Sequence, residues 1–173
     1  YISSKKSAVN KRSGTDFALG VAVEKALDKI VESNTKPKSN VLILGRYGFD
    51  AHKLENTGLF EIVDKKSKIK STKYPKMDIT FMTAHSSKGL GYDNVIIINC
   101  KNETYGFPSK IEDDPVLSFV IKGDKSIEYA EERRLFYVAM TRTKNRVFCI
   151  APEENPSEFL LELKRDYKNV VLN

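Results

Sequence analysis

The residues best suited to chemistry in this sequence include two arginines that each follow an apolar stretch. Arg142 ends the segment 131–142, which reads EERRLFYVAMTR, and Arg46 closely follows the apolar run VLIL at 41–44. A guanidinium can donate two parallel hydrogen bonds, so it can neutralise the oxygens of a phosphoryl group during its transfer. Arg142 stands seven positions after Leu135, which places both on nearly the same face of a helix. Leu135 can therefore anchor this helix while its end presents Arg142.

A second segment brings hydroxyl, imidazole and ammonium groups into one loop. Residues 82–95 read MTAHSSKGLGYDNV and lie between two stretches that are expected to be strands. Thr83 and His85 can donate hydrogen bonds to phosphate oxygens, and so can free amide groups where a helix begins near 86–88. The alternative for His85 is a loop histidine whose hydrogen bonds stay within the protein.

The sequence lacks the glycine-rich loop that ends in Gly-Lys-Ser/Thr and cradles nucleotide phosphates. In the stretch SKGL at 87–90, the lysine precedes the glycine, so Lys88 is wrongly placed for that role. The chain alone is therefore expected to bind nucleotide poorly.

Basic residues gather in two stretches of a chain whose net charge is +6. Such a charge favours a polyanionic partner. A solvated surface without a partner is the alternative for each stretch. The two groups are Lys5, Lys6, Lys11 and Arg12, and then Lys65, Lys66, Lys68, Lys70, Lys73 and Lys76 with Tyr74 among them.

The two cysteines, Cys100 and Cys149, each follow an apolar run, so we expect buried thiols rather than metal ligands. Free thiols fit a reducing compartment, and we expect a cytoplasmic protein. The longest aliphatic run, at 95–98, is too short to cross a bilayer. No metal site and no membrane partner are expected.

Apolar periodicity and turn residues predict alternating strands and helices. A stripe of Leu19, Val23, Leu27 and Ile30 predicts the first helix, capped by Thr15 or Asp16. Such alternation predicts an α/β fold with a mainly parallel sheet covered by helices on both faces, which binds ligands at the carboxyl ends of the strands. We expect a flexible lead-in at 1–14, strands at 41–44, 60–63, 68–71, 78–82, 94–99 and 146–151, and helices at 15–33, 50–55 and 126–141.

The last helix is expected to begin near residue 156. Asn155 would cap it, Pro156 would occupy its first position and Glu158 would reach back to the cap. Leu160, Leu163 and Tyr167 would form its buried side.

These segments resemble motifs of superfamily 1 DNA helicases of the UvrD/Rep type. Residues 131–142 are similar to motif VI, 82–95 to motif V and 42–47 to motif IV, and they occur in the family order IV, V, VI. The stretches GFPS at 106–109 and IEDDP at 111–115 further resemble the DNA helicase IV branch. The resemblance implies that residues 15–173 form the second RecA-like domain, 2A, a three-layer α/β/α unit related to P-loop NTPases but without its own phosphate loop. The accessory domain 2B of UvrD and Rep is absent, because too few residues separate Asp50 from Asp78.

The resemblance also implies roles for single residues. Arg142 and Arg46 match arginines that contact the γ-phosphate of ATP. Gly91 stands where many members carry a glutamate that binds the ribose, and Gly45 stands where UvrD carries a tyrosine that stacks on adenine. Tyr47 is the candidate to replace that stack. The implied contacts to single-stranded DNA are Thr83 and His85, joined by Ser86, Lys88 and the basic-stretch residues Lys68 and Lys70.

The implied activity is ATP-driven, 3′-to-5′ movement along DNA. ATP and Mg²⁺ would require an N-terminal motor domain of the same polypeptide, which would lie outside this sequence. The DNA partner would be a single strand or a 3′-tailed duplex. Two other functions remain open, namely a helicase-like factor that remodels RNA polymerase and a non-catalytic nucleic-acid-binding module, and a fused nuclease is compatible with the sequence.

Overall fold

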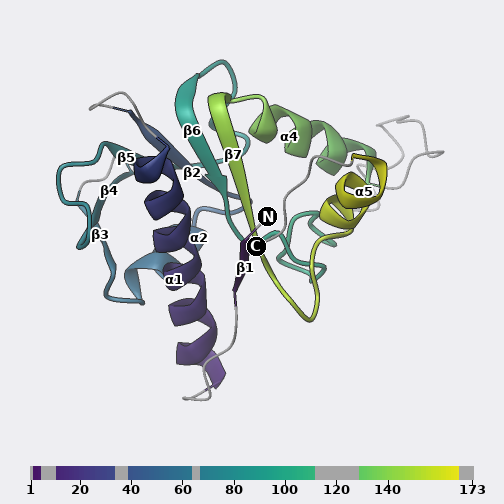
Figure 1. The fold of residues 1–173 in the computed structure, drawn as a ribbon. Coiled ribbons are helices and arrows are strands. Elements are labelled where there is room, and N and C mark those ends of the chain that lie inside the picture. The colour runs from purple at the N-terminus through teal and green to yellow at the C-terminus, as the bar shows by residue number, and fades with distance from the viewer. Residues whose placement is uncertain (1, 5–10, 34–38, 64–66, 112–128, 168–173) are drawn as a thin grey trace.

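The computed structural model describes residues 2–4, 11–33, 39–63, 67–111 and 129–167 of the chain (Figure 1). Seven strands of this part form one sheet in the order β1-β7-β6-β2-β5-β4-β3. They are β1 (Ile2–Ser4), β2 (Val41–Gly45), β3 (Phe60–Ile62), β4 (Lys68–Ser71), β5 (Ile79–Thr83), β6 (Tyr92–Ile97) and β7 (Thr143–Pro152).

The pairing confirms the mainly parallel sheet. From β1 through β7, β6 and β2 to β5 all neighbouring strands run parallel, whereas β4 and β3 add an antiparallel hairpin at one edge. In the central strand, Val41 pairs with Ile79 on one side and with Asn94 on the other. Because β2, β5 and β6 are parallel neighbours, the loops that follow them leave the sheet at the same edge.

Helices cover both faces of the sheet, as predicted. Helices α1 (Lys11–Glu32) and α2 (Asp50–Glu55) lie on one face, and α4 (Ala130–Met140) and α5 (Glu158–Asp166) lie on the other (Figure 1). Side chains of a strand alternate between the two layers. Accordingly Val41 and Ile43 pack beneath α1, whereas Leu42 and Leu44 pack beneath α4 and α5. The fold is the expected three-layer α/β/α arrangement.

The predicted stripe of α1 is confirmed, since Leu19, Val23, Leu27 and Ile30 are all buried against the sheet. Burial of one such side chain contributes about 1.5–3 kcal/mol, which holds α1 on its face of the sheet. Cys100 and Cys149 are free and buried, also as predicted. Burial raises the pKa of the Cys100 thiol.

The described residues of the expected lead-in at 1–14 belong to regular elements. Strand β1 pairs with the outer edge of β7, with Ile2 opposite Ile150. Helix α1 begins at Lys11, so Thr15 and Asp16 lie inside the helix and do not cap it. The physical reason is that the edge of β7 offers unpaired backbone groups, and pairing overrides the polar local composition. The predictions for Lys5, Lys6, Lys65, Lys66, 112–115 and 126–128 fall outside the described residues.

Two predicted helix starts also need correction. Helix α4 begins at Ala130, because Tyr129 has a positive φ of 55° and is not helical. Helix α5 begins at Glu158 with Ser157 as its cap, and the Ser157 hydroxyl accepts a bond from the Phe159 amide at 3.2 Å. Pro156 instead pairs with Lys101 as an isolated bridge.

The buried side of α5 also differs from the prediction. Leu160 is buried and Leu163 packs partly against the core, but Tyr167 is 62% exposed. Phe159 is buried instead and contacts Phe136 of α4, with 5.4 Å between their ring centroids. Tyr167 lies just beyond the helix, which ends at Asp166, and has an extended backbone. Among the described helices, none has the length and apolar character needed to cross a membrane.

Candidate functional site

The predicted site residues lie where β2, β5 and β6 end. Gly45, the last residue of β2, pairs with Thr83, the last residue of β5. Arg46 and the loop 84–91 therefore leave the sheet side by side, and the loop 98–111 leaves from the neighbouring strand β6. This is the edge at which open parallel sheets bind ligands.

Arg46 is held by a carboxylate from the motif VI segment. Its Nε lies 3.0 Å from each carboxylate oxygen of Glu132, and its Nη2 lies 2.7 Å from Oε1. Both side chains are mostly buried, with 16% and 13% of their surfaces exposed. The Arg46 Nη1 lies 3.5 Å from Nδ1 of His85. The three motifs therefore meet at Arg46.

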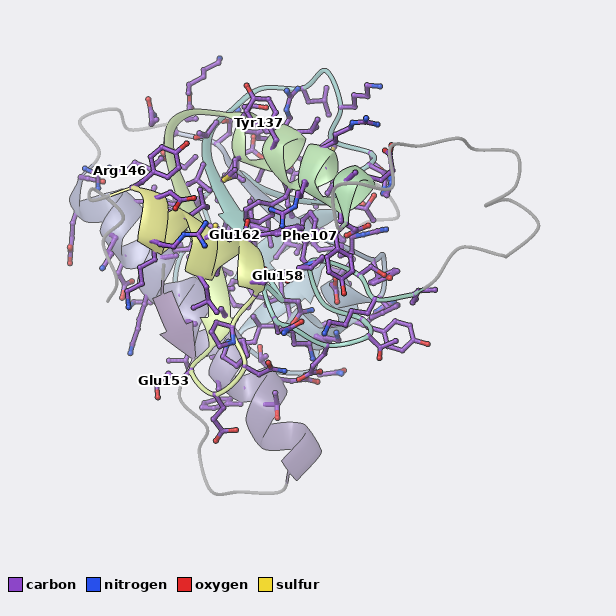
Figure 2. All side chains as sticks on the ribbon, turned by 90° about the vertical axis from the view of Figure 1, so that its right-hand side faces the viewer. Phe107, Tyr137, Arg146, Glu153, Glu158 and Glu162 are labelled. Atoms are coloured by element: carbon purple, nitrogen blue, oxygen red, sulfur yellow. The ribbon has the colours of Figure 1, made fainter. Side chains whose placement is uncertain are left out.

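The loop 98–111 completes this cluster through its backbone. The Ser109 amide donates to Oε2 of Glu132 at 2.9 Å. Phe107 anchors the loop, since its fully buried ring packs edge-on against Phe136 at 5.1 Å between centroids (Figure 2). The turn before it requires Gly106, because a Cβ there would lie 1.9 Å from the Lys101 carbonyl oxygen.

A buried aspartate shapes the turn that follows Arg46. Asp50 accepts the Tyr47 amide at 3.0 Å, the Lys53 ammonium at 2.9 Å and the Asn99 side-chain amide at 2.5 Å. This packing also explains Gly45. A Cβ at that position would lie 2.8 Å from the Asp50 side chain and 2.9 Å from the Phe81 ring. A tyrosine at position 45, as in UvrD, does not fit this turn.

In the motif V loop, Thr83 and Ser86 are hydrogen-bonded to each other. Their hydroxyl oxygens lie 2.8 Å apart, and the Ser86 amide donates to Thr83 Oγ1 at 3.2 Å. Ser87 is buried and bonds to the Ala84 carbonyl at 2.8 Å, so it fixes the loop from within. His85, Ser86 and Lys88 are exposed. The loop therefore offers hydroxyl, imidazole and ammonium groups to solvent on a fixed backbone.

Arg142 has different surroundings from Arg46. Its guanidinium donates to the carbonyl oxygens of Val138 at 2.9 Å and Leu90 at 3.2 Å, and to the Thr141 hydroxyl at 3.1 Å. No carboxylate of the described residues hydrogen-bonds it or forms an ion pair with it. It lies beside the end of motif V, next to Gly91. A Cβ on Gly91 would have only the Lys144 side chain nearby, at 3.7 Å.

The two arginines occupy opposite ends of α4. Glu132, the partner of Arg46, lies in the first turn, and Arg142 stands two positions beyond the last residue, Met140. Glu132 and Met140 are about 12 Å apart along the helix axis. The structure therefore groups Arg46, Tyr47, Thr83, His85 and Ser86 at one point of the edge. It places Arg142 with Gly91 at another.

The basic stretch is partly neutralised within the chain. On β4, the side chains of Lys68 and Lys70 are exposed, while Ile69 between them is buried. Lys68 pairs with Asp78 and donates to Thr80 at 3.1 Å. A cavity of about 530 Å³ separates this hairpin from the motif V loop, and its wall includes Ser67, Ile69, Thr83 and Ser86.

Farther along, Lys73 forms an ion pair with Asp28 at 2.7 Å, and the Tyr74 hydroxyl donates to Asp28 at 2.6 Å. Burial raises the pKa of Asp28, but the bonds from Lys73 and Tyr74 outweigh it and leave the pKa lowered. These two residues therefore tie the stretch to α1.

Glu132, Asp50 and Ser109 are site residues that sequence reasoning missed. Glu132 stands inside the motif VI segment, but nothing in its spacing indicates a partner 86 positions away. The sequence does give an indication of the role of Asp50. An acidic residue between a buried strand and a short amphipathic helix is typical of a turn. Within the described part of the chain, no three or more metal-binding side chains come together.

Comparison with known proteins places the chain among helicases. A family model described as UvrD-like helicase C-terminal domain matches residues 23–154. DNA helicase IV of Escherichia coli is 33% identical over 163 residues, which cover 92% of this chain and 22% of that protein. The ATP-dependent DNA helicase Rep of Buchnera aphidicola is 31% identical over 118 residues, 62% of this chain and 16% of that protein. The chain thus spans about a fifth of the length of these relatives.

A solved structure has the same fold. It is the C-terminal domain of a possible DNA helicase from Lactobacillus plantarum, with a TM-score of 0.52 and 15% sequence identity. The likeness covers 87% of this chain and 77% of that one. The family match over most of the chain, the parallel sheet and the three motifs at one edge agree, and the chain belongs to the UvrD-like helicase C-terminal domain family.

Proposed function

We propose that this chain is the second motor domain of an ATP-dependent DNA helicase that moves 3′ to 5′ along single-stranded DNA. The family membership and the names of its relatives, DNA helicase IV and Rep, support this proposal. The N-terminal motor domain of the same polypeptide would supply the phosphate-binding loop and the ligands of Mg²⁺. The nucleotide would then lie between the two domains.

The observation that carries the proposal is the unbalanced charge of Arg142. Its guanidinium is held by two carbonyl oxygens and a hydroxyl, and no described carboxylate neutralises it. A fixed cation of this kind can bind the oxygens of a γ-phosphate and the charge that develops on them during transfer. ATP, when bound, supplies the phosphoryl group, and Arg142 stabilises its charge.

Arg46 has a different role in this proposal. Its charge is already balanced by Glu132, so a bond to the γ-phosphate requires that it leave this carboxylate. Its second contact, to His85, makes it a link between the motif V loop and α4. We propose that Arg46 senses the nucleotide only when domain closure opens the pair with Glu132.

The motif V loop is the proposed DNA contact. Thr83, His85, Ser86 and Lys88 can donate to phosphate oxygens, which fix a strand without reading its sequence. Lys68 and Lys70 flank Ile69, which lines the cavity beside this loop, but neither lysine lies in the cavity wall. They are therefore more distant candidates, and Lys68 is the weaker one because of its bond to Asp78. The partner would be a single strand or a 3′-tailed duplex.

We propose that this domain discriminates only weakly between nucleotides. Gly45 excludes the family tyrosine, and the Tyr47 ring already stacks on Phe49 with 5.1 Å between centroids. An adenine contact of Tyr47 would require this stack to open. Gly91 supplies no side chain for the ribose.

Substitutions at Arg142 and His85 in the full-length protein separate the two proposed roles. Arg142→Ala should lower ATP turnover by around 10³-fold, because such arginines stabilise the transition state, and should leave nucleotide-free DNA binding intact. Arg142→Lys should not restore turnover, since an ammonium cannot form the forked pair of bonds.

His85→Ala should instead weaken DNA binding and DNA stimulation and spare the basal ATPase. The readouts are steady-state ATPase, with and without single-stranded DNA, and an equilibrium DNA titration. ATP turnover at the parental rate in the Arg142→Ala variant would disprove the proposal that this domain supplies an arginine to the nucleotide site.

A further inference from the structure

Glu132 is the counter-ion of Arg46, although the two residues lie on different elements. Glu132 stands in the first turn of α4, and its carboxylate accepts bonds from Nε and Nη2 of Arg46 at 3.0 Å and 2.7 Å. Both side chains are mostly buried, so solvent screens their attraction only weakly. The guanidinium of Arg46 is therefore held against α4 by a strong ion pair.

A phosphate that binds Arg46 must compete with this carboxylate. Nε and Nη2 together form the fork of donors with which a guanidinium grips a phosphate, and Glu132 occupies both. The remaining nitrogen, Nη1, faces Nδ1 of His85 at 3.5 Å. When a binding group is available only part of the time, the apparent affinity of its ligand falls by that fraction. The ion pair should therefore weaken any phosphate contact that Arg46 makes.

Glu132 keeps a second partner when Arg46 leaves it. Its Oε2 also accepts the Ser109 amide at 2.9 Å. Other contacts fix Ser109, since its hydroxyl lies 2.5 Å from the Tyr47 hydroxyl and accepts the Ile111 amide at 3.2 Å. A buried carboxylate without any partner is costly, whereas one that keeps an amide donor is less so. The Ser109 amide thus lowers the cost of releasing Arg46.

We propose that Glu132 is a positioning residue that competes with the γ-phosphate for Arg46 and thereby limits the affinity for ATP. The inference rests on the proposed function, in which Arg46 meets the γ-phosphate. ADP lacks this phosphate and leaves the ion pair closed, so its affinity does not depend on Glu132. Once the γ-phosphate has left, the carboxylate takes Arg46 back, and this arginine no longer holds the product.

Nucleotide titrations of the full-length protein with Mg²⁺ test the competition. The probes are ADP and the non-hydrolysable β,γ-imido analogue of ATP. Glu132→Gln should bind the analogue about tenfold more tightly, because a charged competing bond is lost, and should bind ADP as the parent does. Arg46→Ala should weaken binding of the analogue. The double variant should match Arg46→Ala alone, because Glu132 acts only through Arg46.

A second variant and a control complete the comparison. Glu132→Asp keeps the charge but shortens the side chain, so it should tighten binding of the analogue by a smaller factor. Glu131→Gln is the matched control, because Glu131 pairs with Arg134 at the surface and should change neither affinity. Thermal melting confirms that each variant folds. A purely structural role of Glu132 would weaken binding of both nucleotides.

The outcomes separate the inference from the proposed function. Unchanged or weaker analogue binding in Glu132→Gln, while Arg46→Ala still weakens it, would overturn the inference and leave the proposed function standing. A gain that persists in the double variant, or an equal gain for ADP, would overturn the inference in the same way. Parental affinity for the analogue in Arg46→Ala would contradict the proposed contact of Arg46 itself, and the inference with it.

Discussion

Glu132 gives the two arginines different charge balances. It binds Arg46 through both carboxylate oxygens and accepts the Ser109 amide as well. Arg142 has carbonyl and hydroxyl partners only among the described residues. Two residues of one type and with similar implied roles therefore differ in charge balance, and this difference is invisible in the sequence.

Glu132→Gln should destabilise the chain by about 2 kcal/mol, because the mostly buried Arg46 loses its counter-charge. Denaturant unfolding measures the change. Glu131→Gln is the matched control, since Glu131 pairs with Arg134 at the surface and both are more than 70% exposed. Such pairs contribute about 0–1 kcal/mol. Equal losses of unfolding free energy in the two variants would show that the pair with Arg46 stabilises the fold no more than a surface ion pair does.

Gly91→Glu tests the departure from the family at the ribose position. The space around Gly91 is open and its φ is not positive, so folding stability should change by less than about 0.5 kcal/mol. In the full-length protein the variant should lower the KM for ATP relative to 2′-deoxy-ATP, because the added carboxylate can accept the 2′-hydroxyl. Gly91→Ala, which adds no carboxylate, should not. An unchanged KM ratio in the Gly91→Glu variant would rule out this position as a ribose site.

At the scale of elements, the sequence predicted most strands and helices of the core. The strand at 41–44 was identified because its apolar run is short and continuous, as in a strand buried on both faces of a parallel sheet. Strand β1 was missed because it depends on the exposed edge of β7, whose paired residues lie 148 positions away in the sequence. The start of α5 was misplaced because Ser157, and not Asn155, meets the helix once Pro156 pairs with Lys101.

The contact between α4 and α5 should make stability pH-dependent. Arg133 forms an ion pair with Glu162 and its guanidinium lies 4.8 Å from the Phe159 ring centroid. Figure 2 shows Glu162 on α5, facing the viewer. The bond from Arg133 lowers the pKa of Glu162 below its ordinary value of 4.5, despite partial burial. The pair therefore stabilises the fold above that ordinary value and is lost as pH falls through the lowered pKa.

Glu162→Gln should accordingly reduce the free energy of unfolding at neutral pH and flatten its decline between neutral and acidic pH. Unfolding curves at a series of pH values measure this. Both side chains are one-third exposed, so the effect is small. A steeper acid decline in the Glu162→Gln variant would contradict the assignment.

At the scale of the whole molecule, we propose that the residues at this edge of the sheet form one wall of a larger nucleotide site. The motif spacing predicted the residues of this wall, because parallel strands bring loops that are distant in sequence to one edge. It did not predict how they divide into a cluster around Arg46 and a second point at Arg142, since that division depends on α4 as a spacer. The roles of these residues in binding ATP and DNA stay predictions.

DNA binding by the chain should be sequence-independent and should weaken as salt rises. Each phosphate that a lysine neutralises releases counterions, so the logarithm of affinity falls linearly with that of salt concentration. Titration of a labelled single strand at several salt concentrations gives the slope, and Lys88→Ala should make it shallower. Affinity that does not change with salt would exclude the phosphate contacts of the motif V loop.

The central claim is that this domain supplies Arg142 to a nucleotide site it cannot complete alone. The most direct measurement is steady-state ATPase of the purified 173-residue chain with single-stranded DNA, beside its Arg142→Ala variant and the full-length protein. We predict that neither form of the chain turns over ATP above the blank, whereas the full-length protein does so in an Arg142-dependent manner. Turnover by the chain that disappears in the Arg142→Ala variant would contradict the account, because the chain would then contain a complete site.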